Sequence, residues 1–120
     1  MAIIEPGHLY KAFIWSCQGL ARAWKSQAAF RMDVAGVCVA VIALCFLRPG
    51  ALWTALLLAG ALLVPVVELL NSAVEEVCDL ITREHNEHIK HAKDMGSAAV
   101  FGTTLINAVL WGAMLWERFF

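Results

Sequence analysis

Three polar side chains share one face of a segment that is otherwise apolar. Glu68, Asn71 and Glu75 stand at i, i+3 and i+7, which places them along one stripe of an α-helix, with Ser72 and Asp79 near its edge. Carboxylates close to lipid are costly, and they need a cation, a metal ion or water as well as a neighbouring helix. The stripe therefore predicts a functional site. The alternative is a set of hydrogen bonds between helices, which Asn and Ser often provide.

A lysine and an aspartate stand at the start of the next apolar segment. If the two helices run antiparallel, Lys93 and Asp94 lie at a depth similar to that of Glu75. Lysine is a point charge suited to phosphate, and carboxylates suit Mg²⁺, which usually bridges to substrate phosphates. Together these groups outline phosphoryl transfer, in which catalysis is mostly positioning and charge neutralisation. For Lys93 alone, the alternative is an anchor to lipid head groups.

Neither of the common nucleotide-binding glycine motifs occurs in the chain. GxxxxGK[ST] and GxGxxG are both missing from the sequence, so the soluble kinase folds that carry them are excluded. Any nucleotide site must be built by another route.

The composition is that of a membrane protein. Of the 120 residues, 61% are hydrophobic and 16% are charged. A soluble chain of this size would bury only about two-thirds of its unfolded surface, and these polar residues are too few to cover the rest. The formal net charge is −1, so no excess positive charge is available for binding nucleic acid. We therefore expect one all-α integral membrane domain over residues 1–120.

Hydrophobic periodicity predicts a surface helix and three spans. Residues 7–26 form an amphipathic pattern typical of a helix that lies on the membrane. Helices over 28–47, 50–81 and 91–118 contain the transmembrane spans, since each has an apolar stretch suited to a bilayer. Arg48-Pro49-Gly50 predicts a helix stop and a tight turn. No secretory signal peptide is recognised, so insertion is expected to depend on the spans themselves.

The basic residues predict the orientation. Seven lie on the side of the amino terminus and two on the other, which predicts a cytoplasmic amino terminus. The seven are Lys11, Arg22, Lys25, Arg31, Arg83, Lys90 and Lys93, and the two are Arg48 and Arg118.

Two motifs carry a resemblance that covers essentially the whole chain. The run ELLNSAVEEVCD over 68–79 and the run AKDMGSAAV over 92–100 resemble the prokaryotic diacylglycerol kinase family, and so do GLARAW at 19–24 and AAFR at 28–31. The resemblance implies a homotrimer of subunits with three transmembrane helices, in the bacterial inner membrane. Its composite active sites would transfer the γ-phosphoryl group of MgATP to the hydroxyl of a membrane lipid.

The resemblance also implies roles for individual residues. Glu68 would be the general base that receives the lipid hydroxyl proton, since a carboxylate in a dry site is a stronger base. The residues that would contact the nucleotide are His8, Trp15, Asn71, Glu75, Glu84, His85, Asn86, Lys93 and Asp94. Glu75 and Gln27 would coordinate magnesium. The lipid would contact Arg22, Trp24, Glu68, Ser97 and Trp111.

Gln27 is the main departure from the family. The family normally has a glutamate at this position, where it joins the Glu75 counterpart at the metal. An amide oxygen can still coordinate Mg²⁺ but contributes no charge, so we expect weak or magnesium-demanding activity. Asp33 is expected to point to a different helix face. Two milder changes are Trp15 in place of a tyrosine, which can still stack, and His8 in place of an arginine, which weakens phosphate contact.

Two further features stand beside the motifs. His85, His88 and His91 recur at spacings of three, which suggests zinc; a solvated polar turn is the favoured interpretation, because this spacing drifts around a helix. Pro65 removes one bond of the helix ladder three residues before Glu68, so a kink is expected there. The kink either shapes a lipid pocket or relieves packing, and packing is favoured.

Several functions compete. The motif form favours phosphorylation of diacylglycerol to phosphatidic acid. Undecaprenol kinase needs the same chemistry on a longer lipid, and a family member with weakened or lost activity is a third possibility. A small proton-coupled membrane transporter could also place a glutamate inside a span. It is disfavoured because the polar residues cluster at one membrane face and the chain has only three spans.

Overall fold

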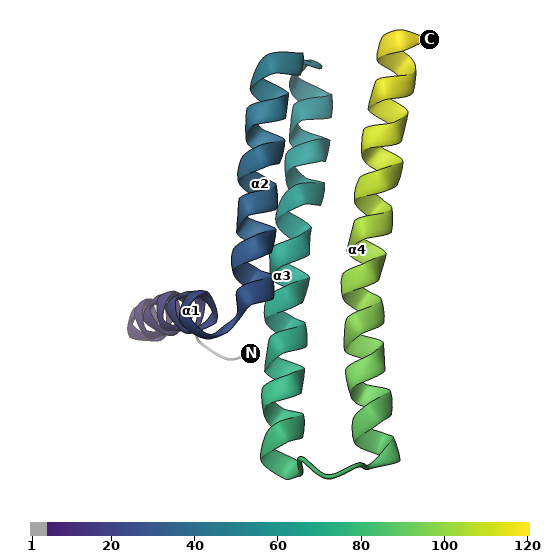
Figure 1. The fold of residues 1–120 in the computed structure, drawn as a ribbon. Coiled ribbons are helices and arrows are strands. Elements are labelled where there is room, and N and C mark those ends of the chain that lie inside the picture. Colours follow the sequence, from purple (N-terminus) through teal and green to yellow (C-terminus); the bar gives the residue numbers. More distant parts are fainter. Residues whose placement is uncertain (1–4) are drawn as a thin grey trace.

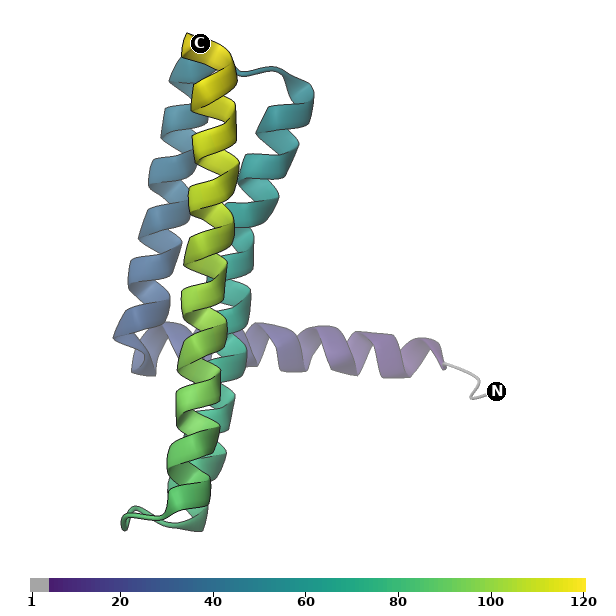
Figure 2. The same cartoon turned by 90° about the vertical axis from the view of Figure 1, so that its right-hand side faces the viewer.

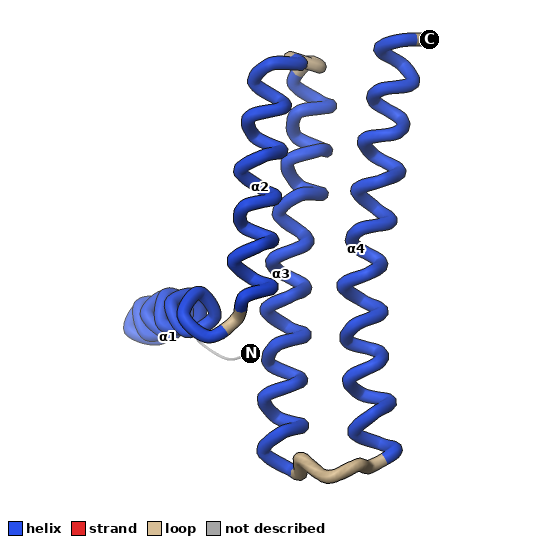
Figure 3. The backbone as a smooth tube through the Cα atoms, viewed as in Figure 1, coloured by secondary structure: helices blue, strands red, loops and turns tan. Residues whose placement is uncertain are grey.

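The computed structural model describes residues 5–120, which form four α-helices and no strand (Figure 1, Figure 3). Helix α1 spans Pro6–Ser26, α2 spans Ala28–Leu47, α3 spans Ala51–Ile81 and α4 spans Glu87–Phe119. The prediction of an all-α fold is confirmed. Helices α2, α3 and α4 are long and apolar enough to cross a membrane, which confirms the three predicted spans.

The three long helices differ in length, and this difference defines the polar end of the molecule. At 1.5 Å per residue, α2 is about 30 Å long, which matches the hydrocarbon core, whereas α3 and α4 are about 46 and 50 Å long. Helix α1 runs across the bundle, and α3 and α4 continue past it (Figure 2). If α1 lies on the membrane surface, the joined ends of α3 and α4 extend into water.

A sharp turn joins α2 to α3, as the sequence predicts. Helix α2 ends at Leu47, and its capping residue Arg48 has a left-handed φ of 47°. Pro49 follows, and Gly50 has a φ of 97°, a conformation that side-chain-bearing residues rarely adopt. Arg118, in the last turn of α4, donates a hydrogen bond to the carbonyl of Leu47. This bond ties the end of α2 to α4.

Asn86 sets the start of α4. Its side-chain oxygen accepts hydrogen bonds from the backbone N–H groups of His88 (2.9 Å) and Ile89 (3.2 Å). This is a regular N-terminal cap, which satisfies donors that the helix itself leaves free. Helix α4 therefore begins at Glu87, earlier than the residue 91 expected from hydrophobic periodicity, because a cap can start a helix in a polar segment.

Little of the chain is buried against itself. The core is a small cluster of Leu44, Leu57 and Met114 between α2, α3 and α4 near the Arg48–Gly50 turn. Many large apolar side chains elsewhere are exposed, among them Phe46 at 83% exposure and Leu80 at 86%. Exposed apolar surface of this extent fits lipid or a protein partner as its cover.

Candidate active site

The polar stripe of α3 begins close to the level of the surface helix. Helix α2 uses 20 residues to run from the end of α1 to the turn. Helix α3 packs beside it in the opposite direction, so it returns to the level of α1 near Leu70. Glu68 and Asn71 are each 8% exposed, whereas Glu75, one turn further on, is exposed. The stripe therefore passes from buried positions to exposed ones towards the end of α3 that joins α4.

Asn71 lies against a glycine of α4. A Cβ atom added at Gly96 would collide with Oδ1 of Asn71, so only glycine leaves room for this side chain. The same Oδ1 atom is buried and has no hydrogen-bond partner within residues 5–120. Buried polar atoms are nearly always paired, and an unpaired one needs an explanation such as a missing ligand. Asn71 is thus fixed against α4 in the space that Gly96 leaves.

Lys93 pairs with Asp79. Its Nζ atom lies 2.8 Å from Oδ1 of Asp79, one turn beyond Glu75. The sequence predicts that Lys93 lies level with Glu75. In the structure its side chain instead meets α3 about one turn further towards the loop before α4. The hydrogen bond with Lys93 lowers the pKa of the Asp79 carboxyl, and the bond with Asp79 raises the pKa of Lys93. Both groups lie beyond the apolar spans, and the pair favours the charged form of each.

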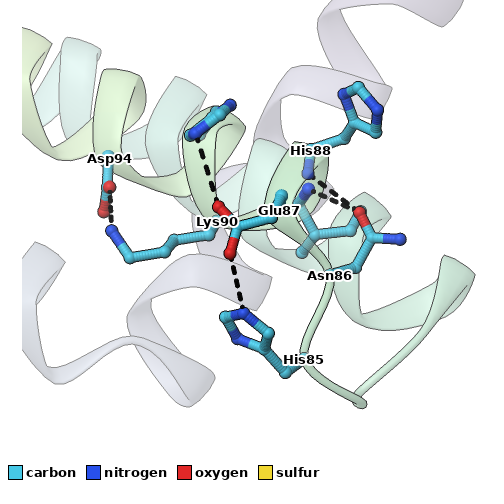
Figure 4. A network of polar contacts seen from close by, with 8 residues as sticks. His85, Asn86, Glu87, His88, Lys90 and Asp94 are labelled. Carbon is cyan, nitrogen blue, oxygen red and sulfur yellow. Dashed lines mark hydrogen bonds and ion pairs between the residues drawn. The ribbon is translucent and has the colours of Figure 1, made fainter.

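A network of polar contacts surrounds the start of α4 (Figure 4). Glu87 accepts a contact from His85 at 3.0 Å and lies 3.7 Å from His91, while Lys90 donates to Asp94 at 2.6 Å. Asp94, a candidate nucleotide contact, is therefore held in an exposed ion pair.

The loop before α4 carries the other predicted nucleotide contacts. Glu84 and His85 are exposed; the backbone N–H of Glu84 donates to the Thr82 hydroxyl, and His85 contacts Glu87. Asn86 serves as the cap of α4. In the part of the chain that the structure describes, no group of three or more His, Cys, Asp or Glu side chains is arranged to hold a metal ion.

The two nucleotide candidates on α1 lie together. The rings of His8 and Trp15 meet edge to face with their centroids 6.4 Å apart. Trp15 is 58% exposed, so its face is open to another ring. Helix α1 extends sideways from the bundle, whereas the loop before α4 lies at its lower end (Figure 1, Figure 2). One chain therefore keeps its two sets of nucleotide candidates apart.

A groove of about 670 Å³ separates α1 from the polar end of α3. Arg22 and Gln27 line it from the α1 side, and Ser72 and Glu76 line it from α3. Gln27 thus shares a groove with Glu76, whereas the sequence paired it with Glu75. The reason is rotational: Glu75 and Glu76 differ by about 100° around the helix axis.

Asp33 is the residue that sequence reasoning underestimated. It lines a cavity of about 220 Å³ together with Ala61, Val64, Asn107 and Trp111. Its Oδ2 atom is buried and, within residues 5–120, has no hydrogen-bond partner. A carboxylate beside the short apolar stretch of 34–47 is the signal that could have identified it, because burying a charge there is costly.

The remaining lipid candidates are only partly brought together. Trp111 lines the same cavity as Asp33, and Arg22 lines the groove beside α1. Trp24 is 50% exposed, and Ser97 is exposed on α4. Within one chain, Trp24 and Ser97 belong to neither of these hollows.

Comparison with known proteins agrees with the residue motifs. The profile of the family described as prokaryotic diacylglycerol kinase matches residues 14–115. A diacylglycerol kinase of Escherichia coli strain K12 is 41% identical over 111 residues, which cover 92% of this chain and 91% of that protein. Diacylglycerol kinases of Haemophilus influenzae and Helicobacter pylori strain 26695 are 40% and 35% identical, covering 90% and 92% of this chain and 92% and 83% of their own lengths. The chain therefore belongs to the prokaryotic diacylglycerol kinase family.

Proposed function

We propose that this protein is a membrane lipid kinase that transfers the γ-phosphoryl group of ATP to the hydroxyl of diacylglycerol, giving phosphatidic acid. The observation that carries the proposal is the stripe of α3, where buried Glu68 and Asn71 lead to exposed Glu75. A lipid hydroxyl at the membrane surface and a phosphate in water could meet along such a stripe. Family membership supplies the substrate class, since relatives are named diacylglycerol kinases.

Glu68 is the proposed general base. Its carboxylate takes the proton of the lipid hydroxyl as that oxygen forms a bond to the γ-phosphorus. The bond from the γ-phosphorus to the oxygen bridging it to the β-phosphate breaks, and ADP leaves with the electron pair. The proton then passes from Glu68 to water. Asn71, one turn from Glu68 on the same stripe, helps to position the reacting groups.

Positive charge for the phosphates comes from the end of α4. Lys93 is charged at neutral pH, and its bond to Asp79 raises its pKa further. A compact ammonium group attracts phosphate oxygens as a point charge and stabilises the charge that develops on them during transfer. His8, Trp15, Glu84, His85, Asn86 and Asp94 complete the proposed nucleotide contacts.

The donor set fits magnesium held partly by substrate. One or two carboxylates and several phosphate oxygens are the usual magnesium ligands, so an all-protein cage is not required. Glu75 would provide the carboxylate. Gln27, which shares a groove with Glu76 within one chain, would add a neutral amide oxygen. When bound, the ion would neutralise charge on the transferring phosphoryl group. Because the amide brings no charge, we propose that this chain needs more magnesium than a relative with a glutamate there.

A homotrimer would complete the site. Within one chain, α1 carries His8 and Trp15 away from the loop at 84–86 (Figure 2). A neighbouring copy could supply the missing half, and the exposed apolar faces of α2 and α4 give it surface to pack against. We place the protein in the bacterial inner membrane with its amino terminus in the cytoplasm, where ATP is available, because seven basic residues lie on that side.

Phosphate transfer to purified lipids tests the proposal. The full chain in mixed micelles is given labelled ATP with either diacylglycerol or undecaprenol, while the magnesium concentration is raised stepwise. Label in diacylglycerol supports the proposal, and label in undecaprenol alone would reassign the substrate. No label in either lipid at any magnesium concentration, from a folded protein, would point to a member that has lost or changed its activity.

A further inference from the structure

Two asparagine and glycine contacts join α3 to α4. Asn71 of α3 lies against Gly96 of α4, and Asn107 of α4 lies against Gly60 of α3. The two contacts are about three turns apart on both helices, so they fall on the same helix faces. In each contact an asparagine side chain fills the space that a glycine leaves on the other helix. The asparagine belongs to α3 in the first contact and to α4 in the second.

The Asn107 contact includes two hydrogen bonds. Its Nδ2 atom donates to the carbonyl of Gly60 at 2.8 Å and to the carbonyl of Thr103 in its own helix at 2.9 Å. Gly60 is buried, and a Cβ atom there would lie 2.8 Å from Cδ1 of Leu110 and 3.2 Å from Oδ1 of Asn107. Close approach of the helices and the hydrogen bond therefore both depend on this pair.

Pro65 lies between the two contacts. It has no N–H group to donate to the carbonyl of Ala61, so the ladder of α3 is interrupted there. A helix interrupted in this way bends more easily than a continuous one. Asn107 fixes α3 before the interruption, Asn71 fixes it after, and Glu68 stands between Pro65 and Asn71.

We infer that Asn107 is a positioning residue that holds Glu68 in place by securing α3 to α4 across the interruption at Pro65. The inference rests on the proposed function for the role of Glu68. Asn107 touches no reacting group in this account. It acts by limiting how far α3 bends at the proline, because bending there would move Glu68, three residues further on, relative to the lipid hydroxyl.

A double-mutant comparison tests the inference in the full chain. Asn107→Leu removes both donors and keeps a branched side chain, whereas Pro65→Ala restores the missing ladder bond. In the native background, Asn107→Leu should lower kcat by about tenfold or more, since displacements of about 1 Å can cost on the order of a hundredfold. In the Pro65→Ala background the same change should cost less than about threefold, because a continuous helix needs no such support.

Amide hydrogen exchange provides a readout that does not require activity. Asn107→Leu should speed exchange in α3 on both sides of Pro65, and this effect should shrink when Pro65→Ala is also present. Thr103→Val is the matched control, because the Thr103 hydroxyl bonds to Val100 within α4 and joins no second helix. It should leave kcat and exchange in α3 close to native. If Asn107→Leu does not fold, Gly60→Ala, which crowds Leu110 and Asn107 at the same contact, should act in the same direction.

Equal losses in the two backgrounds would overturn the inference, because an ordinary packing defect does not depend on the proline. An unchanged kcat for Asn107→Leu would overturn it as well. If the native chain phosphorylates no lipid, the proposed function is wrong, and so is the role of Glu68 as the base. The exchange data would then still decide whether Asn107 steadies α3 at the proline.

Discussion

Replacing Gly96 by alanine should separate helix stability from the geometry of the site. Alanine in place of glycine stabilises a helix interior by about 0.5–1 kcal/mol. At Gly96 the new methyl group would collide with Oδ1 of Asn71, and such overpacking costs about 1–3 kcal/mol. The helix gain offsets only part of the overpacking cost, so we expect a net loss of about 1 kcal/mol in unfolding free energy.

Activity should fall far more than stability. The side-chain amide of Asn71 must move by about 1 Å or turn away, which can cost on the order of a hundredfold in rate when the displaced group positions a substrate. Initial rates of diacylglycerol phosphorylation at saturating ATP would measure the change in kcat, and thermal unfolding in the same detergent would measure the change in stability.

Gly112→Ala is the matched control for this experiment. Gly112 also lies in α4, but a Cβ atom there meets nothing within 4 Å. The control should keep native kcat and gain a little stability. Equal kcat values for Gly96→Ala and Gly112→Ala would refute the reasoning, because Asn71 would then not depend on the space that Gly96 leaves.

Three further predictions concern the metal, the charge pair and the helix cap. Gln27→Glu should raise magnesium affinity, seen as a lower magnesium concentration for half-maximal rate; an unchanged titration would count against a metal contact at this position. Lys93 loses its charge as pH rises through its pKa, which Asp79 raises, and the KM for ATP should rise with that loss. Asp79→Asn should lower this pKa and so move the rise of KM to lower pH. A rise of KM at the native pH would show that the pair does not affect nucleotide binding. Asn86→Ala should cost about 1 kcal/mol of unfolding free energy by removing the cap of α4, while Asn86→Asp should retain most of it; equal thermal unfolding of the two variants would contradict a capping role.

Most of the fold follows from the sequence because the signals are local. Apolar stretches of sufficient length predict the spans, and Arg48-Pro49-Gly50 predicts the turn between α2 and α3 through backbone conformations that these residue types favour. The start of α4 could not be located by periodicity. It depends on the single cap at Asn86 in a segment without apolar alternation.

The site could be predicted only in part, because periodicity gives the face of a helix but not how two helices meet. The stripe of Glu68, Asn71 and Glu75 follows from spacing alone. Rotation and axial register decided that Lys93 meets Asp79 and that Gln27 shares a groove with Glu76. Both depend on packing against other helices, which a sequence pattern does not specify.

The most direct test of the central claim compares Glu68, near the middle of α3, with a glutamate near the C-terminal end of α4. Glu68→Gln removes the proposed base, whereas Glu117→Gln changes a carboxylate that accepts a hydrogen bond from Trp53 near the other end of α4. The rate of ATP-dependent diacylglycerol phosphorylation should fall by on the order of a hundredfold or more for Glu68→Gln and stay close to native for Glu117→Gln. A folded Glu68→Gln protein with the native rate would contradict the assignment of Glu68 as the base.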